Sequence, residues 1–152
     1  MRLLSAAVAS FMVLVAAASA SADDIVTLRS AYSVKETLDR LSAALTAKGI
    51  RVMARINHAA GAKAAGLALK PTELLVFGNP KLGTPLMQTN RLIGLGLPMK
   101  VLAWEDDQGQ VHLAYTRPAA LAAQYDVTGK DEILTRMNQA LEAFTKEAAG
   151  AK

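Results

Sequence analysis

The chain contains few residues whose types could take part in chemistry. They are two histidines and a glycine-containing segment that includes one lysine. His58 and His112 are its only histidines, and an imidazole can act as an acid or base, or bind a metal, near neutral pH. The segment Gly78–Thr84 follows an apolar run and contains Asn79 and Lys81. These residues define the functional alternatives for the chain.

The Gly78–Thr84 segment half-matches a phosphate-binding loop. Four residues separate Gly78 from the pair Gly83-Thr84, but the lysine that should follow Gly83 is absent and Lys81 lies inside the segment instead. A helix that begins after the segment could still hold an anion with its free amides, helped by Lys81. The alternative is a tight connection in which these residues only shape the backbone. Nucleotide hydrolysis is not expected.

Neither histidine belongs to a metal-binding pattern. The chain has no His-x-x-x-His spacing, and its lack of cysteine excludes a thiolate metal site, a thiol redox enzyme and a lipid-anchored lipoprotein. Glu105, Asp106 and Asp107 could add oxygen ligands, but adjacent acids in a turn are usually solvated turn residues. We expect no metal and no cofactor, and we expect Met87 and Met99 to fill the core.

Residues 1–22 have the composition of a cleaved signal peptide. A short positive start, Met1-Arg2, precedes the apolar run from Leu3 to Ala18, and Ala20-Ser21-Ala22 fits a small-x-small cleavage site. The alternative is an uncleaved anchor, but a spanning helix needs about 20 apolar residues and this run is marginal. We expect a periplasmic or secreted protein whose residues 23–152 form a single domain.

The basic charge balance does not identify a partner. The net charge is +4, and removal of Arg2 leaves 4 − 1 = +3 for the mature chain. Such a balance can indicate nucleic acid or an anionic membrane, but Lys and Arg are scattered singly, without aromatic interleaving. We expect no nucleic-acid binding, and no membrane contact after signal cleavage.

Hydrophobic periodicity predicts two long helices. Ser33 and Glu36 have the spacing of a capping box, and Gly49 provides a helix stop. The last helix is expected to start at Thr128 and Asp131. Each helix carries one apolar stripe at helical spacing: Val34, Leu38, Leu41 and Leu45 in the first, and Ile133, Met137, Leu141, Phe144 and Ala148 in the second.

Five strands are expected, at 24–29, 50–56, 74–77, 99–105 and 110–115. Short helices are expected after Asn57, from Thr84-Pro85 and from Pro118. The resulting order β-α-β4-α predicts an α+β fold with both long helices on one face of an antiparallel sheet.

The strand pattern also predicts the two sheet faces. Pairing Glu105 with Gln110 across the turn at 106–109 would place Leu102, Trp104, Val111 and Leu113 on the core face. The opposite face would then present His112 together with Arg51, Met53 and Arg55.

Several stretches resemble a bacterial family known as domain of unknown function 302. The resemblance extends from about Thr37 to Tyr125. It is carried by Arg55-Ile56-Asn57-His58-Ala59-Ala60, by Phe77-Gly78-Asn79-Pro80-Lys81-x-Gly83-Thr84-Pro85 and by Lys100-Val101-Leu102-x-Trp104-Glu105-Asp106. It implies a β-α-β4-α core of the kind seen in TATA-binding-protein-like folds, and it implies that a homodimer can form. It implies no established activity.

Together these features predict a non-enzymatic exported module that binds a small anionic or apolar ligand, or that forms a homodimer. The site would lie between the second sheet face and the Gly78–Thr84 segment. An alternative is a small enzyme that uses His58 or His112 as acid or base in the same cleft. The candidate ligand contacts are Arg55, His58, Asn79, Lys81, Thr84 and His112.

Overall fold

The computed structural model describes residues 24–151, so the predicted signal peptide lies outside the described residues. Five strands are present: β1 (Ile25–Ser30), β2 (Arg51–Asn57), β3 (Thr72–Gly78), β4 (Met99–Glu105) and β5 (Val111–Thr116). The helices are α1 (Val34–Ala47), α2 (His58–Ala64), α3 (Pro80–Thr89), the 3-10 helix η2 (Arg91–Leu95), α4 (Pro118–Gln124) and α5 (Asp131–Ala149). Between residues 24 and 151, no helix combines the length and apolar character needed to cross a membrane.

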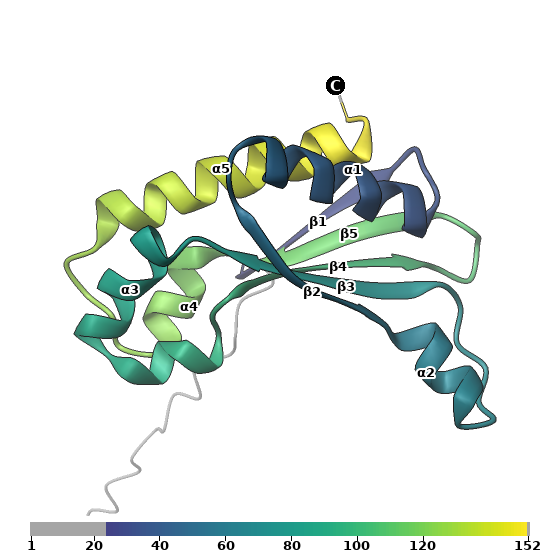
Figure 1. Cartoon of the computed structure of the whole chain (residues 1–152), viewed down its shortest axis with the longest axis horizontal. Coiled ribbons are helices and arrows are strands. Elements are labelled where there is room, and N and C mark those ends of the chain that lie inside the picture. Colours follow the sequence, from purple (N-terminus) through teal and green to yellow (C-terminus); the bar gives the residue numbers. More distant parts are fainter. Residues whose placement is uncertain (1–23, 152) are drawn as a thin grey trace, which may run out of the picture.

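The strands form one antiparallel sheet in the order β1-β5-β4-β3-β2. Helices α1 and α5 lie side by side over one face of this sheet, α2 projects at one end, and α3 and α4 gather at the other (Figure 1). This arrangement confirms the predicted α+β fold. We call the face under α1 and α5 the covered face and the opposite one the open face.

The core lies between the two long helices and the covered face. Leu38, Leu41 and Leu45 of α1 are fully buried, and they pack in the same cluster as Val101 and Leu113 of the central strands. Burial of each such side chain contributes about 1.5–3 kcal/mol. The helical stripe read from the sequence is therefore the stripe that faces the sheet.

Both predicted ends of α1 are confirmed. Ser33 Oγ accepts a hydrogen bond from the Glu36 amide at 3.2 Å. Gly49, just past the helix, has φ +68°, a left-handed conformation that glycine adopts without a Cβ penalty. Arg40 also donates to the Ala148 carbonyl at 3.2 Å, and this bond joins α1 to the end of α5.

The predicted register of the β4–β5 hairpin is wrong by one residue. Glu105 pairs with Val111, not Gln110, because the connection runs from Asp106 to Gln110, one residue more than expected, with Gly109 at φ +80°. A shift of one residue exchanges the faces of a strand. Leu102 and Trp104 therefore lie on the open face, while Ala103 and Leu113 face the core.

Strand β2 does not keep the uniform alternation that its sequence suggested. The pairing with β3 slips between Val52 and Ala54, which leaves Met53 in a bulge. A bulge inserts one residue and exchanges the faces beyond it. Arg55 consequently pairs with Leu75 on the covered side, not on the open face with Arg51 as predicted.

Helix α3 begins earlier than predicted. Its N-cap is Asn79 and its first residue is Pro80, so the Gly78–Thr84 segment is mostly helix. Both Asn79-Pro80 and Thr84-Pro85 have the composition of a helix start, and the structure uses the first. Pro85 then lies inside the helix, where it has no amide to donate to the Lys81 carbonyl one turn earlier.

Candidate functional site

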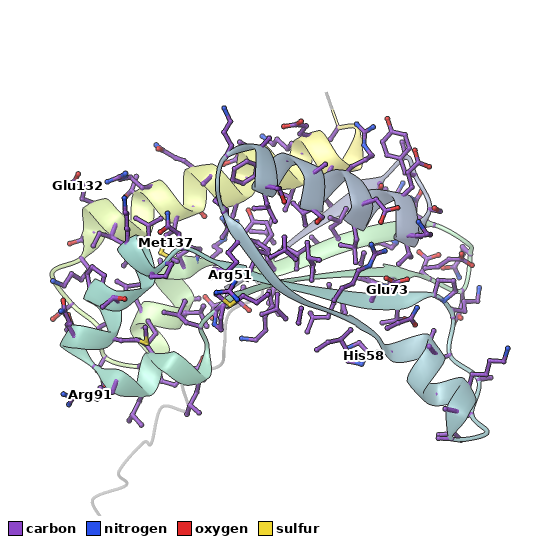
Figure 2. The ribbon with its side chains drawn as sticks, in the orientation of Figure 1. Arg51, His58, Glu73, Arg91, Glu132 and Met137 are labelled. Carbon is purple, nitrogen blue, oxygen red and sulfur yellow. The ribbon has the colours of Figure 1, made fainter. Side chains whose placement is uncertain are left out.

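An apolar cavity of about 220 Å³ lies where β2, β3, α3, α5 and the chain before β4 meet. Phe77 and Gly78 line it from the end of β3, and Met137 and Phe144 line it from α5. Figure 2 places Met137 between α5 and α3. The cavity exists because α5 continues past the core and meets α3 beyond the end of the sheet (Figure 1).

Gly78 allows close packing on the side of the cavity where Met53 lies. A Cβ at this position would lie 3.3 Å from the Pro98 side chain and 3.6 Å from Met53 Cε. Contacts of 3.3 Å are tighter than ordinary van der Waals packing, so a larger residue would push these neighbours apart. The glycine therefore lets β3 approach the chain that leads into β4.

Two of the predicted contact residues reach this cavity, and Lys81 does not. Asn79 and Thr84 are among the lining residues, whereas Lys81 is exposed and outside the lining. The amides that would hold an anion already have partners. The Lys81 amide donates to Asn79 Oδ1 at 3.0 Å, and the Leu82 and Gly83 amides donate to the Asn79 carbonyl at 2.9 and 3.0 Å. An anionic ligand therefore remains a prediction, and it would have to displace these bonds.

Arg55 and His58 lie at the other end of the molecule. Arg55 Nε donates to Glu73 Oε2 at 2.6 Å, and its Nη1 donates to Asp39. The Lys35 ammonium and then the Arg55 guanidinium hold the pKa of Asp39 below its usual value. His58 is exposed at the start of α2, far from Met137 (Figure 2). The structure does not bring this pair to the cavity.

His112 occupies a third location, on the open face. Its Nε2 lies 2.7 Å from Asp106 Oδ2, and its ring stacks on Trp104 with ring centroids 5.1 Å apart. Asp106 Oδ1 accepts from the Gln108 and Gln110 amides at 3.0 and 2.8 Å. The hydrogen bond to His112 is the largest cause that holds the pKa of Asp106 below its usual value, and the two amide bonds lower this pKa further. This cluster fixes the hairpin turn.

Carboxylates and imidazoles do not gather into a metal site in the part of the chain that the structure describes. A shallow, more polar groove runs beside α2, with Trp104, Glu73 and Lys63 among its walls. The apolar cavity is the more enclosed of the two and has few polar groups. It is therefore the better candidate for a ligand site.

The family model described as "Domain of unknown function DUF302" matches residues 26–144. The chain belongs to this family. A crystal structure of an uncharacterised conserved DUF302 protein from Bacillus stearothermophilus superposes with a TM-score of 0.74 at 21% identity, over 82% of this chain and 98% of the other. At that identity the likeness supports the fold alone.

Curated relatives of this DUF302 protein carry another name. A protein named fluoride-specific ion channel FluC 1, from Brucella suis biovar 1 (strain 1330), is 46% identical over 127 residues, which are 83% of this chain and 50% of the relative. FluC 2 from Brucella melitensis biotype 1 (strain ATCC 23456) is also 46% identical, over 47% of its length. The DUF302 chain thus spans about half the length of the curated relatives it matches.

Most of the cavity in the DUF302 chain could not be predicted from its sequence. Met53 and the adjacent pair Leu97-Pro98 come from separate parts of the chain, and no spacing pattern links them. The stripe of α5 was visible, since Met137, Leu141 and Phe144 recur at helical spacing. That stripe predicted burial, but it did not show that its first half faces a cavity rather than the sheet.

The contact between Asp106 and His112 should make the stability of the fold depend on pH. The pKa of Asp106 is lower in the folded protein than in the unfolded chain, where an aspartate has a pKa of about 3.9. The contact therefore stabilises the fold above about pH 3.9, and this stabilisation is lost as the pH falls through the folded-state pKa. Asp106→Asn keeps an oxygen for the two turn amides but removes the carboxylate from His112. We expect Asp106→Asn to lower the free energy of unfolding at pH 7, and the difference from wild type to vanish in strong acid.

Urea unfolding at pH 7 and at pH 3 or below measures this difference. Asp107→Asn is the matched control, because Asp107 is the neighbouring exposed carboxylate of the same turn. A difference between Asp106→Asn and wild type that is the same at both pH values would contradict the assignment.

Proposed function

We propose that the protein is a non-enzymatic module that binds a small apolar ligand in the cavity between α3 and α5. The observation that carries this proposal is the lining, which is almost wholly apolar and includes Phe77, Phe144 and Met137 beside only a few polar residues such as Asn79 and Thr84. Ligand sites are commonly apolar clefts with a small number of placed polar groups. Asn79 and Thr84 fill that second role at the rim.

The size and flexibility of the cavity suit a ligand of one or two rings. Dry apolar cavities of about 150 Å³ bind benzene in an engineered protein, and this one is about 220 Å³. Methionine side chains adapt their shape and make favourable contacts with aromatic rings. Met53, Met87 and Met137 therefore give the cavity walls that can close around a planar apolar molecule.

The geometry gives less support to an enzyme with its active site in this cavity. Neither His58 nor His112 lines the cavity, and a general acid or base must come within hydrogen-bond reach of its substrate. His112 is held against Asp106 at 2.7 Å on the open face. Binding without catalysis is the function that the lining supports best.

The FluC relatives do not change this proposal. Their match covers 83% of this chain and therefore overlaps most of residues 26–144, so we propose that they contain the same domain and the same cavity. Fluoride conduction is named for whole proteins about twice as long as the match, and we do not transfer it to this chain. Export to the periplasm or medium is part of the proposal and rests on residues 1–22.

Filling the cavity tests the proposal. Ala140 lines the cavity from α5, so Ala140→Leu adds three carbons to the space that a ligand would occupy. We expect indole, used as a probe at millimolar concentration, to raise the thermal midpoint of the wild type, because a ligand that binds only the folded state stabilises it. The increase should be absent in Ala140→Leu.

Ala143→Leu is the matched control, since Ala143 lies on the same helix, is exposed and is outside the cavity lining. Its thermal midpoint should respond to indole as the wild type does. An unchanged wild-type midpoint with indole and with a panel of other one- and two-ring apolar probes would refute the proposal.

A second candidate function is dimerisation through the open face. Six of the exposed large apolar side chains lie on the open face or on the segments that flank it, and none comes from α1 or α5. The six are Ile25, Ile56, Leu67, Leu69, Leu92 and Leu95. They lie at both edges of the sheet and around the open face, where a partner that covered this face would bury them.

The open face supplies more than half of the area that a second copy of the chain would need. Five strands at a spacing of about 4.8 Å and a rise of about 3.3 Å per residue give the sheet roughly 500 Å². The flanking loop before β3 and η2 add to this area, and a stable interface needs about 800 Å² per partner. Leu74, Leu102 and Ala114 form a cross-strand row at its centre.

A charge at the centre of the open face should prevent this dimer. Leu102→Asp places an uncompensated carboxylate in the apolar row, and burial of such a group is strongly unfavourable. We expect sedimentation velocity to show a dimer for the wild type at micromolar concentration and a monomer for Leu102→Asp. Ala43→Asp, on the exposed side of α1, should remain dimeric. A monomeric wild type over the whole concentration range would exclude the dimer.

A further inference from the structure

Every methionine in residues 24–151 lines the same cavity. Met53 comes from β2, Met87 from α3, Met99 from β4 and Met137 from α5. Four elements that are separate in the sequence therefore each contribute one thioether to one space.

Core filling accounts for Met99 and Met137, which are buried in the core cluster, and for Met87, which packs against it, as expected for Met87 and Met99. It does not account for Met53. Leucine is the more common core residue of this chain, yet Leu82, Leu97 and Leu141 are its only representatives in the lining, and most leucines of the described chain lie elsewhere. Met53 is 44% exposed, so burial of apolar surface does not account for a methionine there. Met53 instead lies at the mouth of the cavity, near Gly78.

Thioether sulfur is a soft, neutral ligand, and soft ligands select Cu(I) among the metals of biology. The lining contains no cysteine, histidine or carboxylate that would favour a harder ion. A divalent ion would bring two uncompensated charges into an apolar wall, which costs far more than one. The chemistry of the lining therefore favours a soft monovalent ion.

We propose that the four thioethers form a binding site for one Cu(I) ion in this cavity. The proposal rests on the ligand site proposed above and adds a second class of ligand to it. Methionine has three rotatable bonds and can reorient its sulfur. Met87 Sδ lies beside Gly94, where an added Cβ would be 3.6 Å from it, so this thioether would have to reorient to meet the other three. Met53 at the mouth would be the first thioether that an entering ion meets.

Silver(I) is a redox-inert probe for a Cu(I) site, and the methionine methyl groups report its position. We expect a titration of the mature protein, labelled at the methionine methyls, to shift all four methyl signals and to saturate at one equivalent of Ag(I). The double variant Met53→Leu, Met137→Leu should weaken binding at least tenfold, because leucine keeps the volume and removes the sulfur. Such volume-conserving exchanges are usually well tolerated.

The double variant His58→Ala, His112→Ala separates this site from adventitious binding to imidazole and should bind Ag(I) as the wild type does. Binding that follows the histidines, or methyl signals that do not move at one equivalent, would overturn the proposal. Indole added to a second sample distinguishes the two ligand classes. A response to indole without one to Ag(I) would refute the metal site and leave the apolar site standing, and the reverse result would refute only the apolar site.

Discussion

The packing of α1 and α5 against one face of the sheet is the constraint on which the other features depend. Leu38 and Leu41 of α1, with Leu141 of α5, are buried against the covered face. The hydrogen bond from Arg40 to Ala148 joins the two helices where α5 ends. The first half of α5 extends beyond the ends of the strands and meets α3 (Figure 1). The cavity follows from that overhang.

The same packing leaves the open face of the sheet without a long helix over it. Residues 24–151 contain two long helices, and both lie on the covered face. Trp104 and His112 stack on the open face and Asp106 holds the turn beside them, so this side has structural roles of its own. The cavity and the open face are therefore separate candidate surfaces, one for a small ligand and one for a second copy.

The long elements could be predicted from the sequence because their signals are local. Ser33, Glu36 and Gly49 mark the ends of α1, and the stripe of Leu38, Leu41 and Leu45 faces the sheet as predicted. Structural features that depend on a single inserted residue could not be predicted from these local signals. The extra residue before Val111 and the bulge at Met53 each exchange the faces of a strand.

The candidate site was predictable only in part. Asn79 and Thr84 were predicted as contacts because they belong to the unusual Gly78–Thr84 segment, and both line the cavity. Arg55, His58 and His112 were assigned to the same site from the predicted sheet faces, but none of them lines the cavity, and His112 lies apart from the other two. The methionines share no local pattern, because convergence of four elements is a property of the tertiary fold.

The central claim is that an apolar, ligand-accessible cavity lies between α3 and α5, and xenon tests it most directly. Dry apolar cavities bind xenon, whereas polar ones hold ordered water. Diffraction from crystals of the mature protein under xenon pressure should show a xenon peak enclosed by Phe77, Met137 and Phe144. A site that is filled by ordered water, or closed by side chains and without xenon, would contradict the account.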